Sequence, residues 1–330
     1  MDNKKITIND VAKELGVSKT TVSRAISGQG RIGAETRRKV LEYISEHNYK
    51  PSVMAKGLAQ SKTYNIAVTL PGDQNLIELP FFQNCLIGIC NTLNKTDYTA
   101  LLTVTHESDF SQLKRIIVNQ KADGIILTRN IISDPAITYL KESRMPFVVI
   151  GDCADHNVYQ VDHDHVTACR DLTRSLHLQG YNKLALITGN TRHVVTRSRI
   201  KGFTSAYTDA EQATLQNMIF TDANTISEIH GKTEEALQSG VDCIVCADDF
   251  ICNTVLTYLK SKSVSKASDV KIASFYNSPL LKQNTPSVSS IDFNALDLGA
   301  TSARVLLELL SEREAPKQTL LGYKIVLSAQ

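Results

Sequence analysis

The sequence lacks any long apolar run: no stretch of its 330 residues approaches the roughly eighteen consecutive apolar residues that a membrane-spanning helix needs. The segment Met1–Lys5 is polar and no apolar run follows it, so we expect no secretory signal peptide. The seven cysteines are odd in number and scattered, which argues against a disulfide framework. We therefore expect a cytoplasmic protein in reducing surroundings, with no membrane partner, and not an exported binding protein.

Net charge is also low, at +2, but it is unevenly distributed. Residues 1–62 carry twelve Lys and Arg against six Asp and Glu, whereas the rest of the chain carries 24 against 28. A small basic segment on a mildly acidic body suits contact with phosphates through that segment alone, although a solvated helical face would have the same charge. The length of the chain predicts two or three folding units.

The basic segment carries the pattern of a helix-turn-helix, two short helices around a turn at Gly16. Thr7 can cap the first helix with Asp10 as its partner, and Ser18 can cap the second. Apolar residues at helical spacing predict a small shared core of Val11, Ala12, Leu15, Val17, Val22, Ala25 and Ile26. In this layout the second helix enters the DNA major groove.

Several polar residues at the start of the second helix fall outside that core: Lys19, Thr20, Ser23 and Arg24. Side chains of these types hydrogen-bond base edges and phosphates. A third helix is expected from about Glu35 to His47, with Val40, Leu41 and Ile44 facing the first two helices. Pro51 ends it.

These residues resemble the lactose-repressor (LacI/GalR) family of bacterial transcription regulators. The shared motifs are T-I-N-D-V-A from Thr7, G-V-S-x-x-T-V-S-R from Gly16, E-T-R-x-x-V from Glu35, N-Y-K-P from Asn48 and A-K-G-L-A from Ala55. Weaker matches continue almost to the C-terminus. The resemblance implies binding to a palindromic operator. We predict that Lys19, Thr20 and Arg24 read bases, and that Thr7, Ser23 and Arg31 hold phosphates, with Ser18 in the same DNA-binding set.

Residues 51–62 have few bulky apolar anchors, so alone they bury too little surface to offset their ordering entropy. In the family, this hinge becomes a short helix in the minor groove of operator DNA, where its leucine wedges between base steps. Leu58 matches that leucine and Ala55 matches in register; a plain linker is the alternative. We expect a DNA-binding domain at 1–50, a hinge at 51–62, and an effector-binding and dimerisation domain at 63–330.

From Tyr64 onward, short apolar runs alternate with amphipathic segments of helix length. The runs predict buried parallel strands at 65–70, 99–104, 124–127, 147–150, 183–188, 243–246 and 270–275. Helical segments include 82–93, 110–119, 136–142, 167–178 and 250–260. This alternation predicts α/β sheets covered on both faces, divided between two lobes. The resemblance implies a periplasmic-binding-protein-like arrangement with a ligand cleft between the lobes, beyond the carboxyl ends of the strands.

Two charged residues follow predicted strands and are candidates for effector binding. Arg199 matches the arginine of the family's R-x-x-G-F motif, which the resemblance implies is an effector ligand; a surface arginine is the alternative. Asp248 occupies a position that faces effector in the family and could accept hydrogen bonds from a sugar, or serve a structural role. Asp249 is expected to cap the following helix instead.

The remaining effector candidates are weaker. Tyr276 stands where the family commonly has an aspartate that binds sugar hydroxyls, so it could stack on a ring, donate a hydrogen bond or lie outside the site. Phe81 and Phe82 match the family's N-P-F-F segment and could stack on a ligand or pack in the core. His163 matches a position with a stacking or polar residue.

Three patterns are interpreted as coincidental. Gly28, Gly30 and Gly33 fit a dinucleotide-binding string, but a helix and not a strand precedes them. Asp162, His163, Asp164 and His165 look like a metal cluster, but alternating residues on a strand point to opposite faces, so the four cannot all converge and no metal site is expected. Cys243 and Cys246 are expected to be buried thiols.

The preferred hypothesis is a homodimeric transcriptional repressor, associated with the nucleoid, whose operator affinity is controlled by a carbohydrate effector. A dimer is favoured because the chain lacks the leucine-rich C-terminal helix through which some relatives form tetramers. The alternative is an enzyme or metabolite-binding module with accessory N-terminal helices. Against it, no nucleophile–base set, phosphate loop or metal set stands out, and neither catalysis nor a cofactor is predicted.

Overall fold

The computed structural model describes residues 6–28, 30–47, 49, 56–57, 60–72, 80–262, 270–284 and 287–328. The chain divides into two compact units, residues 1–64 and 65–330. The predictions for Ala55 and Leu58 lie outside the described residues. Within the described residues, no helix combines the length and the apolar character needed to cross a bilayer.

Among its described residues, the first unit contains the helices α1 (Ile8–Glu14), α2 (Lys19–Ser27) and α3 (Ala34–Glu46). Thr7 caps α1 in a reciprocal box with Asp10, and the Ser18 hydroxyl accepts the Thr21 backbone N–H at the start of α2, as predicted. Gly16 turns the chain between α1 and α2 with a φ of 61°, which a side chain would strain. The helix-turn-helix is therefore confirmed.

A small apolar cluster joins these helices. Val11, Ala12, Val22, Ala25 and Val40 are buried in it, and the other residues predicted for this core pack around them. Leu41 is an exception to the prediction, because its side chain is 43% exposed. It follows Val40 directly, and one residue turns about 100° around a helix, so the two cannot face the same neighbours.

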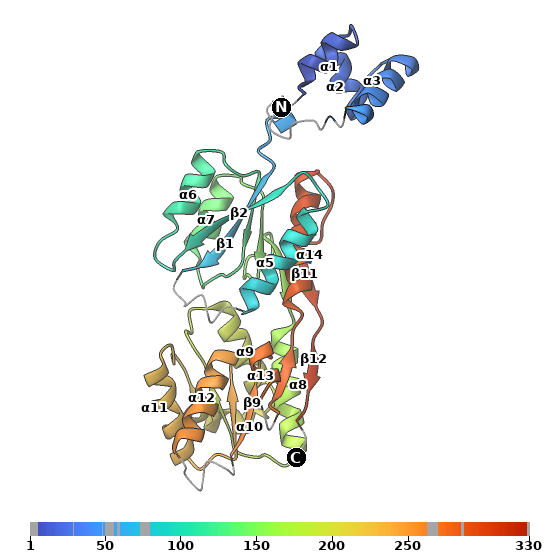
Figure 1. Ribbon diagram of the computed structural model, residues 1–330. Helices are drawn as coiled ribbons and strands as arrows, with labels where there is room; N and C mark the ends of the chain where they lie inside the picture. The colour runs from blue at the N-terminus through green and yellow to red at the C-terminus, as the bar shows by residue number, and fades with distance from the viewer. Residues whose placement is uncertain are drawn as a thin grey trace. The chain divides into compact units, whose positions relative to one another are not determined.

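The second unit contains two six-stranded sheets, one in each of two lobes (Figure 1). The order in the first sheet is β11 (Gln318–Leu321), β5 (Tyr159–His163), β4 (Phe147–Ile150), β3 (Gly124–Leu127), β1 (Asn65–Pro71) and β2 (Thr99–Thr105), all parallel. The order in the second is β12 (Lys324–Val326), β10 (Ser289–Asp292), β9 (Lys271–Ser274), β8 (Cys243–Cys246), β6 (Leu184–Ile187) and β7 (Ile219–Phe220). Here only β12 runs antiparallel to its neighbour.

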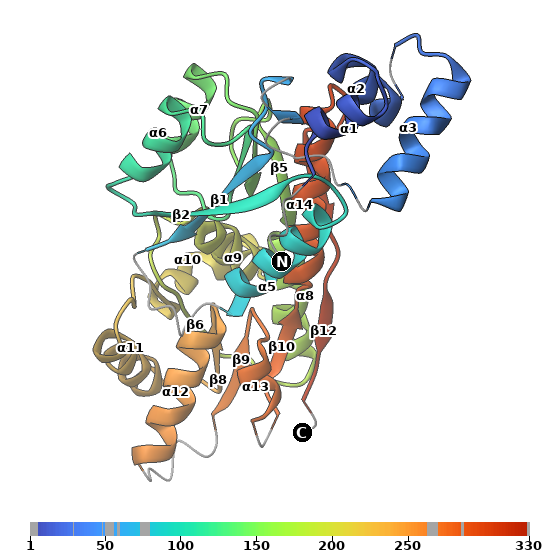
Figure 2. The same cartoon turned by 45° about the horizontal axis from the view of Figure 1, so that its top comes forward.

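Helices cover both faces of each sheet, as Figure 1 and Figure 2 show. The first sheet packs α5 (Pro80–Leu93) and α14 (Ala295–Leu310) on one face, and α6 (Ser111–Val118) and α7 (Pro135–Glu142) on the other. The second packs α8 (His165–Leu178) and α9 (Val194–Thr204) on one face, and α11 (Ile226–Gln238) and α12 (Asp249–Lys262) on the other. Three short helices complete this lobe: α10 (Asp209–Leu215), η2 (Gln216–Met218) and α13 (Pro279–Lys282).

The chain crosses between the lobes three times. It leaves β5 of the first sheet for α8, returns from β10 to α14, and leaves β11 for β12. The first crossing spans only Asp164, and each of the others spans two residues, Phe293–Asn294 and Gly322–Tyr323. Groups at these crossings therefore lie where any motion of one lobe against the other must occur.

The seven predicted strands are confirmed within one or two residues at each end. Their apolar runs are long enough to identify because parallel strands are buried on both faces. The sequence did not identify β5, β10 or β11, which mix polar and apolar residues, nor the long helix α14. All seven cysteines are free, and Cys243 and Cys246 are buried on β8 as predicted.

Two glycines allow α5 and α14 to lie against each other. A Cβ added to Gly299 would lie 2.0 Å from the backbone oxygen of Cys85, and one added to Gly88 would lie 1.9 Å from that of Leu296. Neither backbone can yield without shifting its helix.

We expect Gly299→Ala to lower the free energy of unfolding by at least about 1–3 kcal/mol, the usual cost of overpacking. The matched control is Gly231→Ala in the middle of α11, where an added Cβ meets nothing within 4 Å. There alanine should stabilise by roughly 0.5–1 kcal/mol, because it favours the helix. Urea unfolding of both variants measures the contrast, and equal changes would contradict the close contact of α5 and α14.

Candidate functional site

The predicted DNA-reading side chains share one exposed face of the first unit. Lys19, Thr20, Ser23 and Arg24 on α2 are exposed, as is Arg31 in the turn before α3. The buried Val22 and Ala25 hold the opposite face of α2 against the other helices. This leaves two cations and two hydroxyls free to contact a ligand at the start of a helix.

The two capping residues are less available. The Thr7 backbone N–H and hydroxyl both donate to Asp10 Oδ2, at 2.9 and 2.7 Å. The Ser18 hydroxyl is 2.9 Å from that of Thr21 and accepts its backbone N–H. A phosphate contact from Thr7 would have to replace one of its bonds to Asp10.

The three glycines that mimic a dinucleotide-binding string lie in the turn between α2 and α3. Gly28 ends α2 in the left-handed conformation, with a φ of 71°. No strand precedes them, so the interpretation of this string as a turn is confirmed.

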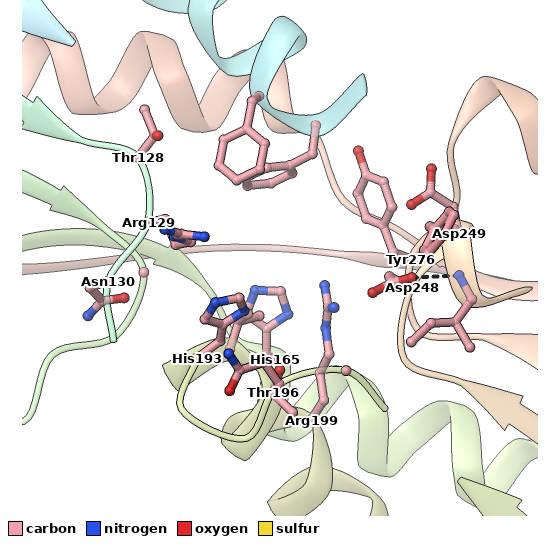
Figure 3. Close-up of a pocket in the computed structure, with 18 of the residues that line it drawn as sticks. Thr128, Arg129, Asn130, His165, His193, Thr196, Arg199, Asp248, Asp249 and Tyr276 are labelled. Carbon is pink, nitrogen blue, oxygen red and sulfur yellow. Dashed lines mark hydrogen bonds between the residues drawn. The ribbon is translucent and has the colours of Figure 1, made fainter. Parts of the chain in front are cut away.

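A cavity of about 500 Å³ lies between the lobes of the second unit. Its polar lining follows the carboxyl ends of strands from both sheets: Glu107 after β2, Arg129 and Asn130 after β3, Asn190 after β6, Asp248 after β8 and Tyr276 after β9. Figure 3 shows Thr196 and Arg199 reaching it from α9, together with His193, which directly precedes that helix. Of the predicted effector residues, the structure brings five together here: Phe81, Phe82, Arg199, Asp248 and Tyr276.

The glycine and the phenylalanine of the R-x-x-G-F motif each have a packing reason. Gly202 lets α9 approach α8, since a Cβ there would lie 2.6 Å from the Val166 oxygen. Phe203 is fully buried in the core. These two residues fix the helix, and Arg199, one turn earlier, is held with its guanidinium in the cavity (Figure 3). The Arg199 Nε is buried and has no hydrogen-bond partner among the described residues.

Of the two aspartates after β8, the one that caps the next helix is not the one expected. Asp248 Oδ1 accepts the Ile251 backbone N–H at 2.9 Å, so Asp248, and not Asp249, caps α12. Asp249 is the first residue of the helix and is 8% exposed. Both line the cavity. Burial, with a contribution from the charge of Asp248, raises the pKa of Asp249 to about 6.

This shift predicts how stability depends on pH. In the folded state Asp249 holds its proton up to a pKa of about 6, whereas the unfolded state releases it near its ordinary value of 3.8. The unfolded state therefore binds fewer protons between these values, and stability falls as pH rises from about 4 to 6.

Asp249→Asn should remove this loss, gaining up to about 3 kcal/mol relative to wild type between pH 4 and pH 7. Chemical unfolding at several pH values measures it. Glu142→Gln, at an exposed position on α7, is the control and should follow wild type throughout. If the free energy of unfolding of Asp249→Asn changed with pH in parallel with that of wild type, the raised pKa of Asp249 would be contradicted.

The aromatic candidates form one wall of the cavity. The ring of Phe81 contacts Phe82 and Tyr276 edge to face, with centroids 5.2 and 5.9 Å away. Tyr276 is 5% exposed, and burial together with Asp249 raises the pKa of its hydroxyl, which stays protonated and able to donate. Aromatic walls of this kind suit the apolar faces of a ring-shaped ligand.

His163 does not line the cavity, contrary to the prediction. It is 2% exposed and packs against Phe293, with ring centroids 4.8 Å apart. Its neighbours Asp162 and His165 line the cavity instead. As predicted, the four residues of the Asp162–His165 string do not all converge, because Asp164 turns away and caps α8 by accepting the Thr167 N–H. The other three do come together, with one ligand atom of each within 4.8 Å of those of the other two. Because β5 ends at His163 and α8 begins at His165, the alternation of side chains along a strand does not decide where His165 points.

Sequence reasoning missed the contacts that join the lobes at the cavity. Glu107 Oε1, from the first lobe, accepts from Asn190 Nδ2 at 2.7 Å and lies 2.9 Å from His193 Nε2, both in the second lobe. Glu107 Oε2 pairs with Arg192 at 3.3 Å. An isolated antiparallel β-bridge between Ile131 and His193 adds a backbone contact between the lobes. No local motif marks these residues, since they belong to different lobes and meet only in the tertiary structure.

Comparison with known proteins bears on both units. Residues 7–52 match the family described as "Bacterial regulatory proteins, lacI family", and residues 65–326 match "Periplasmic binding proteins and sugar binding domain of LacI family". The chain belongs to the LacI family. It is a DNA-binding transcriptional regulator with a helix-turn-helix headpiece and a periplasmic-binding-protein-like domain, as the sequence predicted.

Individual members of the LacI family resemble the chain over nearly its whole length. The transcriptional regulator MalR of Streptococcus pneumoniae (strain TIGR4) is 29% identical over 97% of this chain and 99% of its own. Solved structures share the fold: the lac repressor dimer bound to operator and an anti-inducer has a TM-score of 0.79 at 20% identity and covers 98% of both chains. The CelR–cellobiose complex has a TM-score of 0.71 at 23% identity, covering 98% of this chain and 99% of its own.

Proposed function

We propose that the chain is a repressor that binds a palindromic operator as a homodimer and is released or retained by a carbohydrate bound between the lobes. The proposal that the chain binds an effector rests on the cavity. There Arg199, whose buried Nε has no partner among the described residues, converges with the carboxyl groups of Asp248 and Asp249 and with an aromatic wall. The family supports binding over catalysis, and a regulator of this type works in the bacterial cytoplasm, at the nucleoid.

Operator recognition is assigned to the exposed face of α2. Lys19, Thr20 and Arg24 would contact base edges in the major groove, while Ser23, Arg31, Ser18 and Thr7 would hold phosphates. Residues 51–62 form the tether, in which Ala55 and Leu58 would enter the minor groove. Two headpieces on adjacent half-sites bind far better than one, which favours a dimer.

A sugar fits the cavity chemically. Hydroxyl groups need donors and acceptors in turn: Arg199 and Tyr276 donate, Asp248 accepts, and the aromatic wall covers a ring face. The CelR structure contains cellobiose, and this supports a carbohydrate here. Asp249, protonated below a pH of about 6, would change from donor to acceptor as the pH rises.

Effector binding would act on DNA by linkage. A ligand that contacts both lobes favours whichever arrangement brings its contacts together, and it shifts operator affinity only by its differential affinity for the two arrangements. A coupling of roughly 1–3 kcal/mol would change operator affinity about 5–150-fold. The contacts of Glu107 with Asn190 and His193 would break or shorten in the same step, because they join the lobes at the cavity.

The test of this function is sequence-specific DNA binding by the full chain. Wild-type protein should shift a palindrome with a central CG step, or one selected from random duplexes, at concentrations that leave a scrambled duplex unbound. Footprints should cover two half-sites. Equal affinity for every duplex would reject the repressor proposal.

A further inference from the structure

One group of side chains at the first crossing between the lobes is not explained by sugar binding. Asp162 and His163 end β5, and His165 begins α8. All three residues are buried, and each offers a ligand atom within 4.8 Å of those of the other two. Buried polar groups in proteins are normally hydrogen-bonded, and buried charged groups are paired or coordinate a metal.

The histidines in this group lack the hydrogen bonds that buried imidazoles need. Neither Nδ1 nor Nε2 of His163 has a partner among the described residues, although its side chain is 2% exposed. His165 Nδ1 is unpartnered as well. The Asp162 carboxylate is held in place, because its Oδ1 accepts the His163 backbone N–H at 2.8 Å. Three unsatisfied ring nitrogens beside a carboxylate imply a missing partner.

We propose that Asp162, His163 and His165 bind one divalent transition-metal ion, with Zn²⁺ as the representative. Two imidazoles and one carboxylate form a ligand set that zinc and its neighbours accept, whereas Mg²⁺ and Ca²⁺ prefer oxygen ligands alone. His165 Nε2 lies 3.3 Å from Asp162 Oδ1, and ligand atoms about 2.0–2.2 Å from a tetrahedral zinc are about 3.3–3.5 Å apart. Side-chain rotation of His163 would complete the set.

The position of the group gives the ion a role. Asp162 and His165 line the cavity, so the fourth coordination position would face it and could take water or a ligand oxygen. The ion would also join the end of a strand in one lobe to the start of a helix in the other. Phe293, at the second crossing, packs on both histidines, with centroids 4.8 and 4.6 Å away. Metal binding would therefore act on two of the three crossings.

The test uses full-length, tag-free protein that has been stripped of metal, with neither DNA nor sugar present, so its result is independent of the repressor proposal. Titration with Co²⁺ should give the visible bands of a four- or five-coordinate ion with nitrogen and oxygen ligands, at one ion per chain. Zn²⁺ should displace it and Mg²⁺ should not. The melting temperature should rise with Zn²⁺ concentration.

His163→Gln and His165→Gln should weaken Co²⁺ binding by more than the roughly 10–100-fold that loss of an outer partner costs. His156→Gln, at an exposed position away from the group, is the matched control and should bind as wild type does. If His163→Gln fails to fold by circular dichroism, His165→Gln and Asp162→Asn decide the outcome. Three results would overturn the proposal: a spectrum of six-coordinate aqueous Co²⁺ alone, absorption bands of sulfur ligands, or wild-type Co²⁺ affinity in the folded ligand variants.

Discussion

Arg24→Ala is expected to weaken the affinity of the dimer for its operator by a factor that lies between about 30 and more than about 10⁴. A bidentate contact between arginine and a base contributes about 1–3 kcal/mol of discrimination, and a dimer loses it at both half-sites, so the cost is about 2–6 kcal/mol. Arg24 is exposed on α2, and the buried Val22 and Ala25 hold the helix in place without it. The headpiece should therefore stay folded.

Fluorescence anisotropy on the selected palindrome and on a scrambled duplex measures this effect. Affinity for the scrambled duplex should change far less, because it depends on phosphate charge alone. Arg38→Ala is the matched control: Arg38 is an exposed arginine of the same unit, on α3, that pairs with Glu42 at 3.3 Å. An equal loss of affinity in both variants, or for both duplexes, would reject base reading by Arg24.

The second large effect is expected at Arg199. Arg199→Ala should leave operator affinity unchanged while abolishing the change caused by the effector, up to about 150-fold for a coupling of 3 kcal/mol. The residue lies in the second unit and lines the cavity, and its buried Nε has no hydrogen-bond partner among the described residues. Substitution removes the ligand contact and no packing of α9, which Gly202 and Phe203 maintain.

The measurement starts with a thermal-shift panel that includes cellobiose, maltose, monosaccharides and sugar phosphates, from which the sugar that raises the melting temperature most is taken forward. Operator affinity is then measured with and without that sugar. Arg197→Ala is the control, since its exposed side chain donates to the Thr191 oxygen at 3.2 Å and does not line the cavity. An unchanged response in Arg199→Ala would remove this residue from the site, and no shift with any sugar would reject a carbohydrate effector.

Much of the site could be predicted because its residues stand at marked positions. Arg199 has a motif whose glycine and phenylalanine serve packing, and Asp248 and Tyr276 lie two residues after the ends of β8 and β9. That Asp248 caps α12, and not Asp249, could not be predicted. Which of two adjacent aspartates caps a helix depends on where the helix begins, and helix ends vary by a residue or two.

The sequence by itself determined the helix-turn-helix, the two α/β lobes and the family, because capping residues, apolar periodicity and strand–helix alternation are local signals. Only the tertiary structure decided that Glu107 joins His193 across the cavity, that Gly88 and Gly299 set the approach of α5 to α14, and that Asp162, His163 and His165 converge at a crossing. Each of these depends on the distance between segments that are far apart in the sequence or belong to different elements. Such distances follow from the packing of whole sheets and helices, and no pattern within a single segment encodes them.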